Sequence, residues 1–148
     1  MLEIIPMSHA HLDAVCSIEN ECFTIPWSRQ SFVDDLAKDN SSYFVAVING
    51  EVAGYAGMWH IVNEGHITNV AVRPIYQNMG IGNALLCKII DTAKTLEMVG
   101  ILLEVRTGNY AAQKLYAKNG FILERIRKNY YAETGEDALI MWKELNNG

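Results

Sequence analysis

One turn in the chain has the residue types of an anion-binding site. It runs Gln77-Asn78-Met79-Gly80-Ile81-Gly82-Asn83, and apolar residues at helical spacing follow it directly. The first N–H groups of a helix have no partner inside the helix, so a glycine-containing turn placed there can bind an anion such as a pyrophosphate. A flexible connection between a strand and a helix is the alternative interpretation.

Two familiar glycine motifs are excluded at this turn. A dinucleotide fingerprint requires a third glycine where Leu85 stands. A P-loop requires Gly-Lys-Ser/Thr, and the chain has Gly82-Asn83-Ala84 there. The sequence therefore predicts an anion site without the lysine used in nucleotide hydrolysis.

A single carboxylate, Glu104, interrupts the apolar run Ile101–Arg106. In an extended strand, Glu104 points to the opposite face from Leu103 and Val105. Ligands gather at the carboxyl ends of parallel strands, so this glutamate is a candidate site residue. An edge-strand or surface glutamate is the alternative.

The elements that must position these residues follow from the pattern of the whole chain. A strand at Leu2–Pro6 is followed by a helix from the Ser8 cap to about Phe23 and by a second helix capped by Ser28. Strands at 43–48 and 51–60 are joined by Asn49-Gly50, a two-residue hairpin signal. With the strand from Ile67 to Val72, they form an antiparallel meander.

The second half of the chain alternates helices and strands. The helix after Gly82 connects the strand at 67–72 to the strand at 101–106, so these two strands should be parallel. Asn109 caps the next helix and Gly120 ends it, before strands that begin at Phe121 and at Ala138. A loop is expected between them, from Asn129 to Asp137. The predicted fold class is α/β with a mixed sheet.

Composition limits the class of protein further. The 148 residues suit a single domain spanning residues 1–148, and no apolar run reaches the length of a membrane span. No secretory signal is evident at the N-terminus, so we expect a cytoplasmic protein with reduced thiols at Cys16, Cys22 and Cys87. No metal-ligand spacing is present. The net charge of −5 argues against nucleic-acid binding and suits a basic peptide partner.

Five ordered segments, together with the Gln-x-x-Gly-x-Gly turn, resemble the GCN5-related N-acetyltransferases (GNAT). They are similar in particular to the family of bacterial ribosomal-protein-alanine N-acetyltransferases. The segments are Phe23-x-x-Pro26-Trp27-Ser28, Asn69-Val70-Ala71-Val72, Leu103-Glu104-Val105-Arg106-x-x-Asn109, Leu115-Tyr116-x-x-x-Gly120-Phe121 and Arg127-Lys128-Asn129-Tyr130-Tyr131. The resemblance implies a GNAT fold, with an antiparallel meander joined to a parallel central strand pair and helices on both faces.

The resemblance also implies roles for individual residues. Glu104 matches the general base that removes a proton from the acceptor amine, and Tyr116 matches the general acid that protonates the leaving CoA thiolate. Acetyl-CoA is the implied co-substrate. Val70, Ala71 and Val72 match the family segment that contacts its pantetheine arm, and Asn109 matches a further contact. The segment that binds its pyrophosphate is matched by Gln77, Asn78, Met79, Gly80, Ile81, Gly82 and Asn83.

Several alternatives stand beside these roles. Tyr116 could be a core aromatic, and His66 or Glu64 could serve as the base instead of Glu104. Cys87 is expected to pack rather than act as a nucleophile. Asn78 and Met79 replace residues that are often basic or polar in the family, so we expect backbone amides to hold the pyrophosphate.

The implied acceptor is the N-terminal α-amine of a protein, ideally an alanine-initiated basic ribosomal protein. Trp27, Tyr130 and Tyr131 are candidate walls of a peptide groove, although Trp27 could instead anchor the core. Three acidic residues of the predicted loop, Glu133, Glu136 and Asp137, could attract basic side chains. A small-molecule amine such as a polyamine or aminoglycoside, or a non-catalytic acyl-CoA-binding role, remains an alternative.

Overall fold

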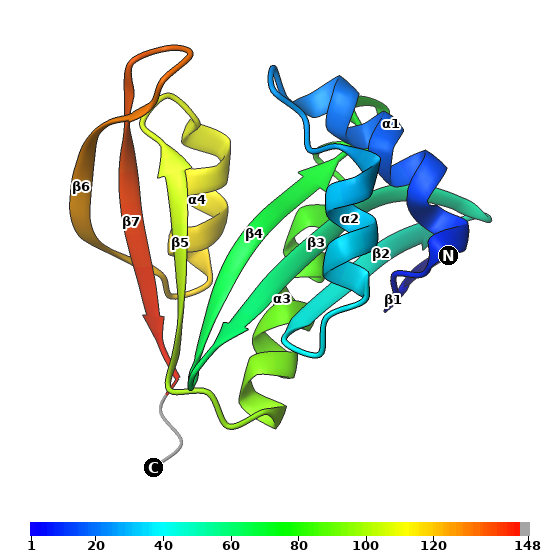
Figure 1. Cartoon of the computed structure of the whole chain (residues 1–148), viewed down its shortest axis with the longest axis horizontal. Helices are drawn as coiled ribbons and strands as arrows, with labels where there is room; N and C mark the ends of the chain where they lie inside the picture. Colours follow the sequence, from blue (N-terminus) through cyan, green and yellow to red (C-terminus); the bar gives the residue numbers. More distant parts are fainter. Residues whose placement is uncertain (146–148) are drawn as a thin grey trace.

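A computed structural model of the chain describes residues 1–145, which form one seven-stranded sheet with helices on both faces (Figure 1). The strands are β1 (Leu2–Pro6), β2 (Ser41–Ile48), β3 (Glu51–Ile61), β4 (Glu64–Val72), β5 (Gly100–Arg106), β6 (Ile122–Tyr131) and β7 (Glu136–Glu144). The helices are α1 (Leu12–Cys22), α2 (Arg29–Leu36), α3 (Ile81–Thr95) and α4 (Tyr110–Lys118), with 3₁₀ turns at His9–His11 and Pro74–Tyr76. The predicted α/β fold class is confirmed.

The first four strands form the predicted antiparallel meander. Asn49 and Gly50 both have positive φ, at 50° and 82°, as a tight two-residue hairpin requires. The β3–β4 register shifts beside Gly57, where the Tyr43 ring lies so close that a Cβ would be 2.2 Å from it. This close approach explains why glycine stands at position 57.

Strands β4 and β5 are parallel, as predicted, but over a short distance only. Three residue pairs form the ladder, and the last of them is His66 with Leu102. Beyond that pair the two strands diverge, which Figure 1 shows as a V that opens between β4 and β5. This opening positions the candidate site.

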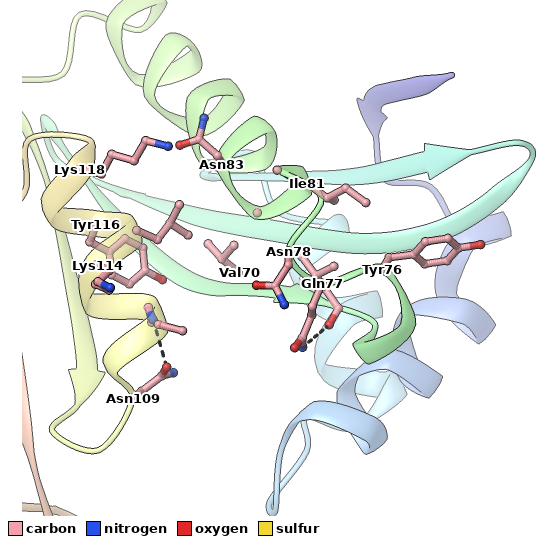
Figure 2. A pocket seen from close by; sticks show the side chains of 16 residues that line it. Val70, Tyr76, Gln77, Asn78, Ile81, Asn83, Asn109, Lys114, Tyr116 and Lys118 are labelled. Atoms are coloured by element: carbon pink, nitrogen blue, oxygen red, sulfur yellow. Dashed lines mark hydrogen bonds between the residues drawn. The ribbon is translucent and has the colours of Figure 1, made fainter.

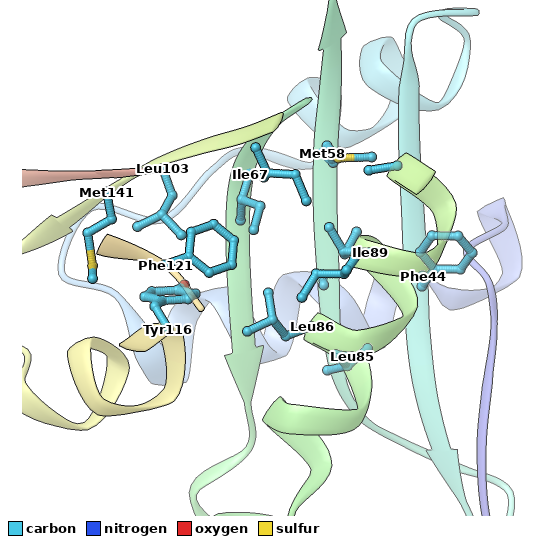
Figure 3. Packing of buried hydrophobic residues seen from close by; sticks show 14 of the residues in the cluster. Phe44, Met58, Ile67, Leu85, Leu86, Ile89, Leu103, Tyr116, Phe121 and Met141 are labelled. Carbon is cyan, nitrogen blue, oxygen red and sulfur yellow. The ribbon is translucent and has the colours of Figure 1, made fainter. Parts of the chain in front are cut away.

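Two hydrophobic cores cover the two faces of the sheet. Helices α1 and α2 pack on one face through residues such as Ile18 and Phe32. Helices α3 and α4 pack on the other face, where Figure 3 shows Leu86 of α3 and Tyr116 of α4 meeting the side chains of the sheet. Within the described part of the chain, no helix has the length and apolar character of a membrane span.

Three boundary predictions were wrong. β4 begins at Glu64, three residues before the predicted start at Ile67. Ser8 precedes a 3₁₀ turn at His9–His11 rather than an α-helix, which begins at Leu12. The predicted loop 129–137 is much shorter, because β6 continues to Tyr131 and β7 starts at Glu136. β7 lies between β5 and β6 in the sheet, so its pairing with both neighbours extends the two strands into this segment.

Candidate active site

A cavity of about 440 Å³ lies between the N-terminus of α3 and helix α4 (Figure 2). Gly80 precedes α3 with φ of 80°, a left-handed conformation that glycine adopts without strain, and Asn78 has φ of 65°. The turn therefore presents the free amides of the helix start to the cavity. Its lining residues are Val70, Val72, Tyr76, Gln77, Asn78, Gly80, Ile81, Gly82, Asn83, Asn109, Ala111, Ala112, Lys114, Leu115, Tyr116 and Lys118.

Most of the residues assigned to the co-substrate by resemblance line this cavity, but two of them lie elsewhere. Met79 is 56% exposed, and Ala71 packs in the core under α1 and α2. The Gln77 amide donates to the carbonyl of Val72 at 3.1 Å, so it fixes the turn against β4 (Figure 2). The Asn109 side chain accepts from the Ala112 N–H at 3.1 Å and caps α4 as predicted.

A second cavity, of about 330 Å³, is bordered by β4, β5 and the loop before α2. The candidate acceptor residues Trp27, Tyr130 and Tyr131 line it together with Glu104. Burial alternates along β5: Leu103 and Val105 are buried in the core under α3 and α4, whereas Glu104 is only partly buried. The alternation predicted for this strand is therefore confirmed.

The two cavities meet in the opening between β4 and β5. Four residues line both of them, namely Val70, Asn109, Ala112 and Tyr116. Tyr116 is buried, and burial is the main cause that raises the pKa of its hydroxyl above the ordinary 10.0. The phenol is thus protonated at neutral pH, and it stands where a group passing between the cavities would go. Tyr116 also contacts Phe121, so it is a core aromatic as well as a cavity residue.

Glu104 is held by a partner on the neighbouring strand. His66 Nε2 lies 2.8 Å from Glu104 Oε1, and the two side chains are 22% and 18% exposed. An ionised carboxylate only accepts hydrogen bonds, so the ring N–H of His66 is the donor. His66 belongs to the last pair of the β4–β5 ladder, and its ring also meets Trp59 edge to face at 5.8 Å. The side-chain bond continues the strand connection at the point where backbone pairing stops.

The loop that carries Trp27 is anchored by a buried carboxylate. Glu19 is 1% exposed and accepts from the Trp27 backbone N–H at 2.6 Å, from the Asn69 amide at 3.2 Å and from the Tyr55 hydroxyl. Burial, the largest cause, raises its pKa above the usual 4.5. The Trp27 ring stacks on Trp59 and also lines the second cavity, and its contact with an acceptor peptide stays a prediction.

Arg106 adds side-chain contacts to the β5–β7 backbone ladder near the turn of the β6–β7 hairpin. Its guanidinium pairs with Glu133 and with Glu136, the latter at 3.4 Å, and lies 3.9 Å from the centre of the Tyr131 ring. Asp137 pairs with Lys128 at 3.4 Å. Each of the three acidic residues therefore has a basic partner within the hairpin region, where three carboxylates share two cations. That they attract a basic acceptor stays a prediction.

Sequence reasoning assigned no role to Arg106 and considered His66 only as a rival base. Arg106 lies two residues after Glu104 on the same strand, so the sequence indicates that both point to the same face. The sequence does not indicate their contact partners, because these belong to other strands. Among residues 1–145, no group of three or more histidines, cysteines and carboxylates is arranged to hold a metal ion. Cys87 lines neither cavity.

The sequence was compared with family models and with known proteins. The model of the acetyltransferase (GNAT) family matches residues 12–121. The [ribosomal protein bS18]-alanine N-acetyltransferase of Escherichia coli K12 is 37% identical over 88% of this chain and 88% of its own length. The chain is therefore an acyltransferase by class.

Solved structures agree with the sequence comparisons. The crystal structure of the ribosomal-protein-S18-alanine N-acetyltransferase from Escherichia coli superposes with a TM-score of 0.92, at 33% identity over 100% of this chain and 96% of that one. The PaiA N-acetyltransferase of Thermoplasma acidophilum, solved with coenzyme A, shares the fold alone, at a TM-score of 0.84 and 17% identity over 98% and 99% of the two chains. The chain belongs to the acetyltransferase (GNAT) family.

Proposed function

We propose that this protein transfers the acetyl group of acetyl-CoA to the N-terminal α-amine of a protein that begins with alanine, with ribosomal protein bS18 as the first candidate. The observation that carries the proposal is the meeting of two cavities between β4 and β5, with Tyr116 lining both and Glu104 lining the second. The activity named for the Escherichia coli relative supports this choice of acceptor.

The first cavity suits the co-substrate. The amides at the start of α3 face it, and among the described residues that line it none is acidic. A pyrophosphate is stabilised by such amides and by the positive end of the helix dipole. The open edge of β4 beyond His66 leaves room for an extended arm to pair with its backbone, as the resemblance implies for Val70, Ala71 and Val72.

The second cavity suits an amine acceptor. Glu104 removes a proton from the acceptor ammonium group, directly or through a water, and the free amine attacks the thioester carbonyl. A backbone N–H of β4 polarises that carbonyl. The C–N bond forms, the C–S bond breaks, and Tyr116 gives its proton to the departing thiolate. The nitrogen releases its second proton to water, and water returns a proton to Tyr116 and takes the one held by Glu104. The products are an acetylated amine and CoA. No covalent acetyl-enzyme is required.

His66 serves in this scheme as a positioning residue, since it contacts Glu104 and lines neither cavity. Trp27, Tyr130 and Tyr131 form the walls that receive the first residues of the acceptor. The three free cysteines suit a reducing, cytoplasmic location.

The test is a CoA-release assay with a matched set of acceptors. An alanine-initiated basic peptide should release CoA, and the same peptide with a blocked α-amine should not. Release with polyamines or aminoglycosides and not with the peptide would instead identify a small-molecule acetyltransferase. Acetyl-CoA binding without release for any amine would identify a non-catalytic module.

A further inference from the structure

The wall of the first cavity has a charge opposite to that of the protein as a whole. The chain has 17 acidic and 12 basic residues, yet the described residues lining this cavity include two lysines and no carboxylate. The lysines, Lys114 and Lys118, are four residues apart on α4, so they lie on the same side of the helix. In the described part of the chain neither forms an ion pair.

Helix stability does not account for this arrangement. Two like charges at this spacing repel each other, and the helix has no carboxylate to relieve them. Lys118 is the last residue of α4, where a cation interacts favourably with the helix dipole. Lys114 lies in the middle of the helix and gains nothing from that effect.

The cavity thus has two separate cationic regions. One is the start of α3 at Gly80, whose amides can take a pyrophosphate. The other is the lysine pair on the α4 wall, and Figure 2 shows Lys118 extending across from Asn83 of α3. A lysine ammonium is a mobile point charge that suits an exposed phosphate dianion. Acetyl-CoA carries such a dianion, its 3′-phosphate, in addition to the pyrophosphate.

We propose that Lys114 and Lys118 bind the 3′-phosphate of acetyl-CoA and so select it over acyl thioesters that lack this phosphate. The inference rests on the proposed use of acetyl-CoA at this cavity. Both lysine side chains are exposed, so solvent screens their attraction to the phosphate. Each lysine is therefore expected to change the affinity for acetyl-CoA by at most about fivefold. Together they predict discrimination of about tenfold.

The experiment compares acetyl-CoA with 3′-dephospho-acetyl-CoA as co-substrate, with the same acceptor peptide. In the wild-type protein, the KM of the dephospho compound should be about tenfold higher, with little change in kcat. In Lys114→Met/Lys118→Met the two KM values should become equal. Lys94→Met, an exposed lysine of α3 outside the cavity, should behave as wild type.

Two results would overturn the proposal: equal KM values in the wild-type protein, or full discrimination retained in the double variant. Calorimetric titration with CoA and with 3′-dephospho-CoA separates this proposal from the proposed function, because it requires no acceptor. If the wild-type protein distinguishes the two ligands, the double variant does not, and no amine is acetylated, then the lysine site stands and the proposed acetyl transfer fails.

Discussion

Replacing His66 with alanine tests how the carboxylate of Glu104 is held. The variant removes one hydrogen bond of 2.8 Å between two side chains that are each about one-fifth exposed. A hydrogen bond to a charged group contributes about 1.5–3 kcal/mol when buried, so about 1–2 kcal/mol is reasonable after discounting for partial exposure. If that energy holds Glu104 in its productive position, kcat should fall roughly 5- to 30-fold.

The assay is CoA release from acetyl-CoA with the alanine-initiated peptide, measured as kcat and as KM for each substrate. We expect the KM for acetyl-CoA to be unchanged, because His66 does not line the first cavity. His66→Gln keeps an N–H donor and should recover part of the loss. His60→Ala is the matched control, since His60 also makes a 2.8 Å side-chain contact, with Ser42, and lines neither cavity.

Comparing the fall in kcat caused by Glu104→Gln with that caused by His66→Ala decides which residue is the base. If Glu104 is the base, Glu104→Gln should reduce kcat by about 10²- to 10⁴-fold, which exceeds the effect of His66→Ala. The reasoning is refuted if His66→Ala costs more than Glu104→Gln, because His66 would then be the base and Glu104 the group that orients it.

Three further predictions follow from other contacts. Because burial raises the pKa of Tyr116 above 10.0, its proton is retained in alkaline buffer, so kcat should not decline between about pH 8 and pH 10; a decline there that Tyr116→Phe abolishes would contradict this. Arg106→Gln removes the side-chain contacts that hold the turn of the β6–β7 hairpin and should raise the KM for peptide roughly three- to tenfold, with no change for acetyl-CoA. Equal increases for both substrates would argue against this anchoring. Gly80→Ala places a side chain on a residue in the left-handed conformation and should lower the free energy of unfolding by about 1–2 kcal/mol, measured by chemical denaturation. Gly82→Ala, inside α3, should not destabilise the protein. Equal stabilities for the two variants would disprove the strain argument.

Local chemistry made much of the fold predictable. The Asn49-Gly50 hairpin depends on two residues that tolerate positive φ, and both have it. The caps at Ser28 and Asn109 depend on one side-chain oxygen each, and both accept from the helix start. The alternation of Leu103 and Glu104 follows from strand geometry alone. Such features are encoded within a few residues.

Long-range pairing was not predictable in the same way. β7 inserts between β5 and β6, and only that placement explains why Tyr131 belongs to a strand and why Arg106 meets Glu133. The contact between His66 and Glu104 arises because the β4–β5 ladder stops at His66. Neither hydrophobic periodicity nor turn residues indicate the residue at which the pairing of two strands ends.

The most direct test of the central proposal is mass spectrometry of an alanine-initiated basic peptide after incubation with acetyl-CoA and the protein. We predict one acetyl group on the α-amine, formed far more slowly by Glu104→Gln although this variant keeps the unfolding temperature of the wild-type protein. An unmodified peptide, acetylation of lysine side chains in place of the α-amine, or an unchanged rate for Glu104→Gln would contradict the proposal.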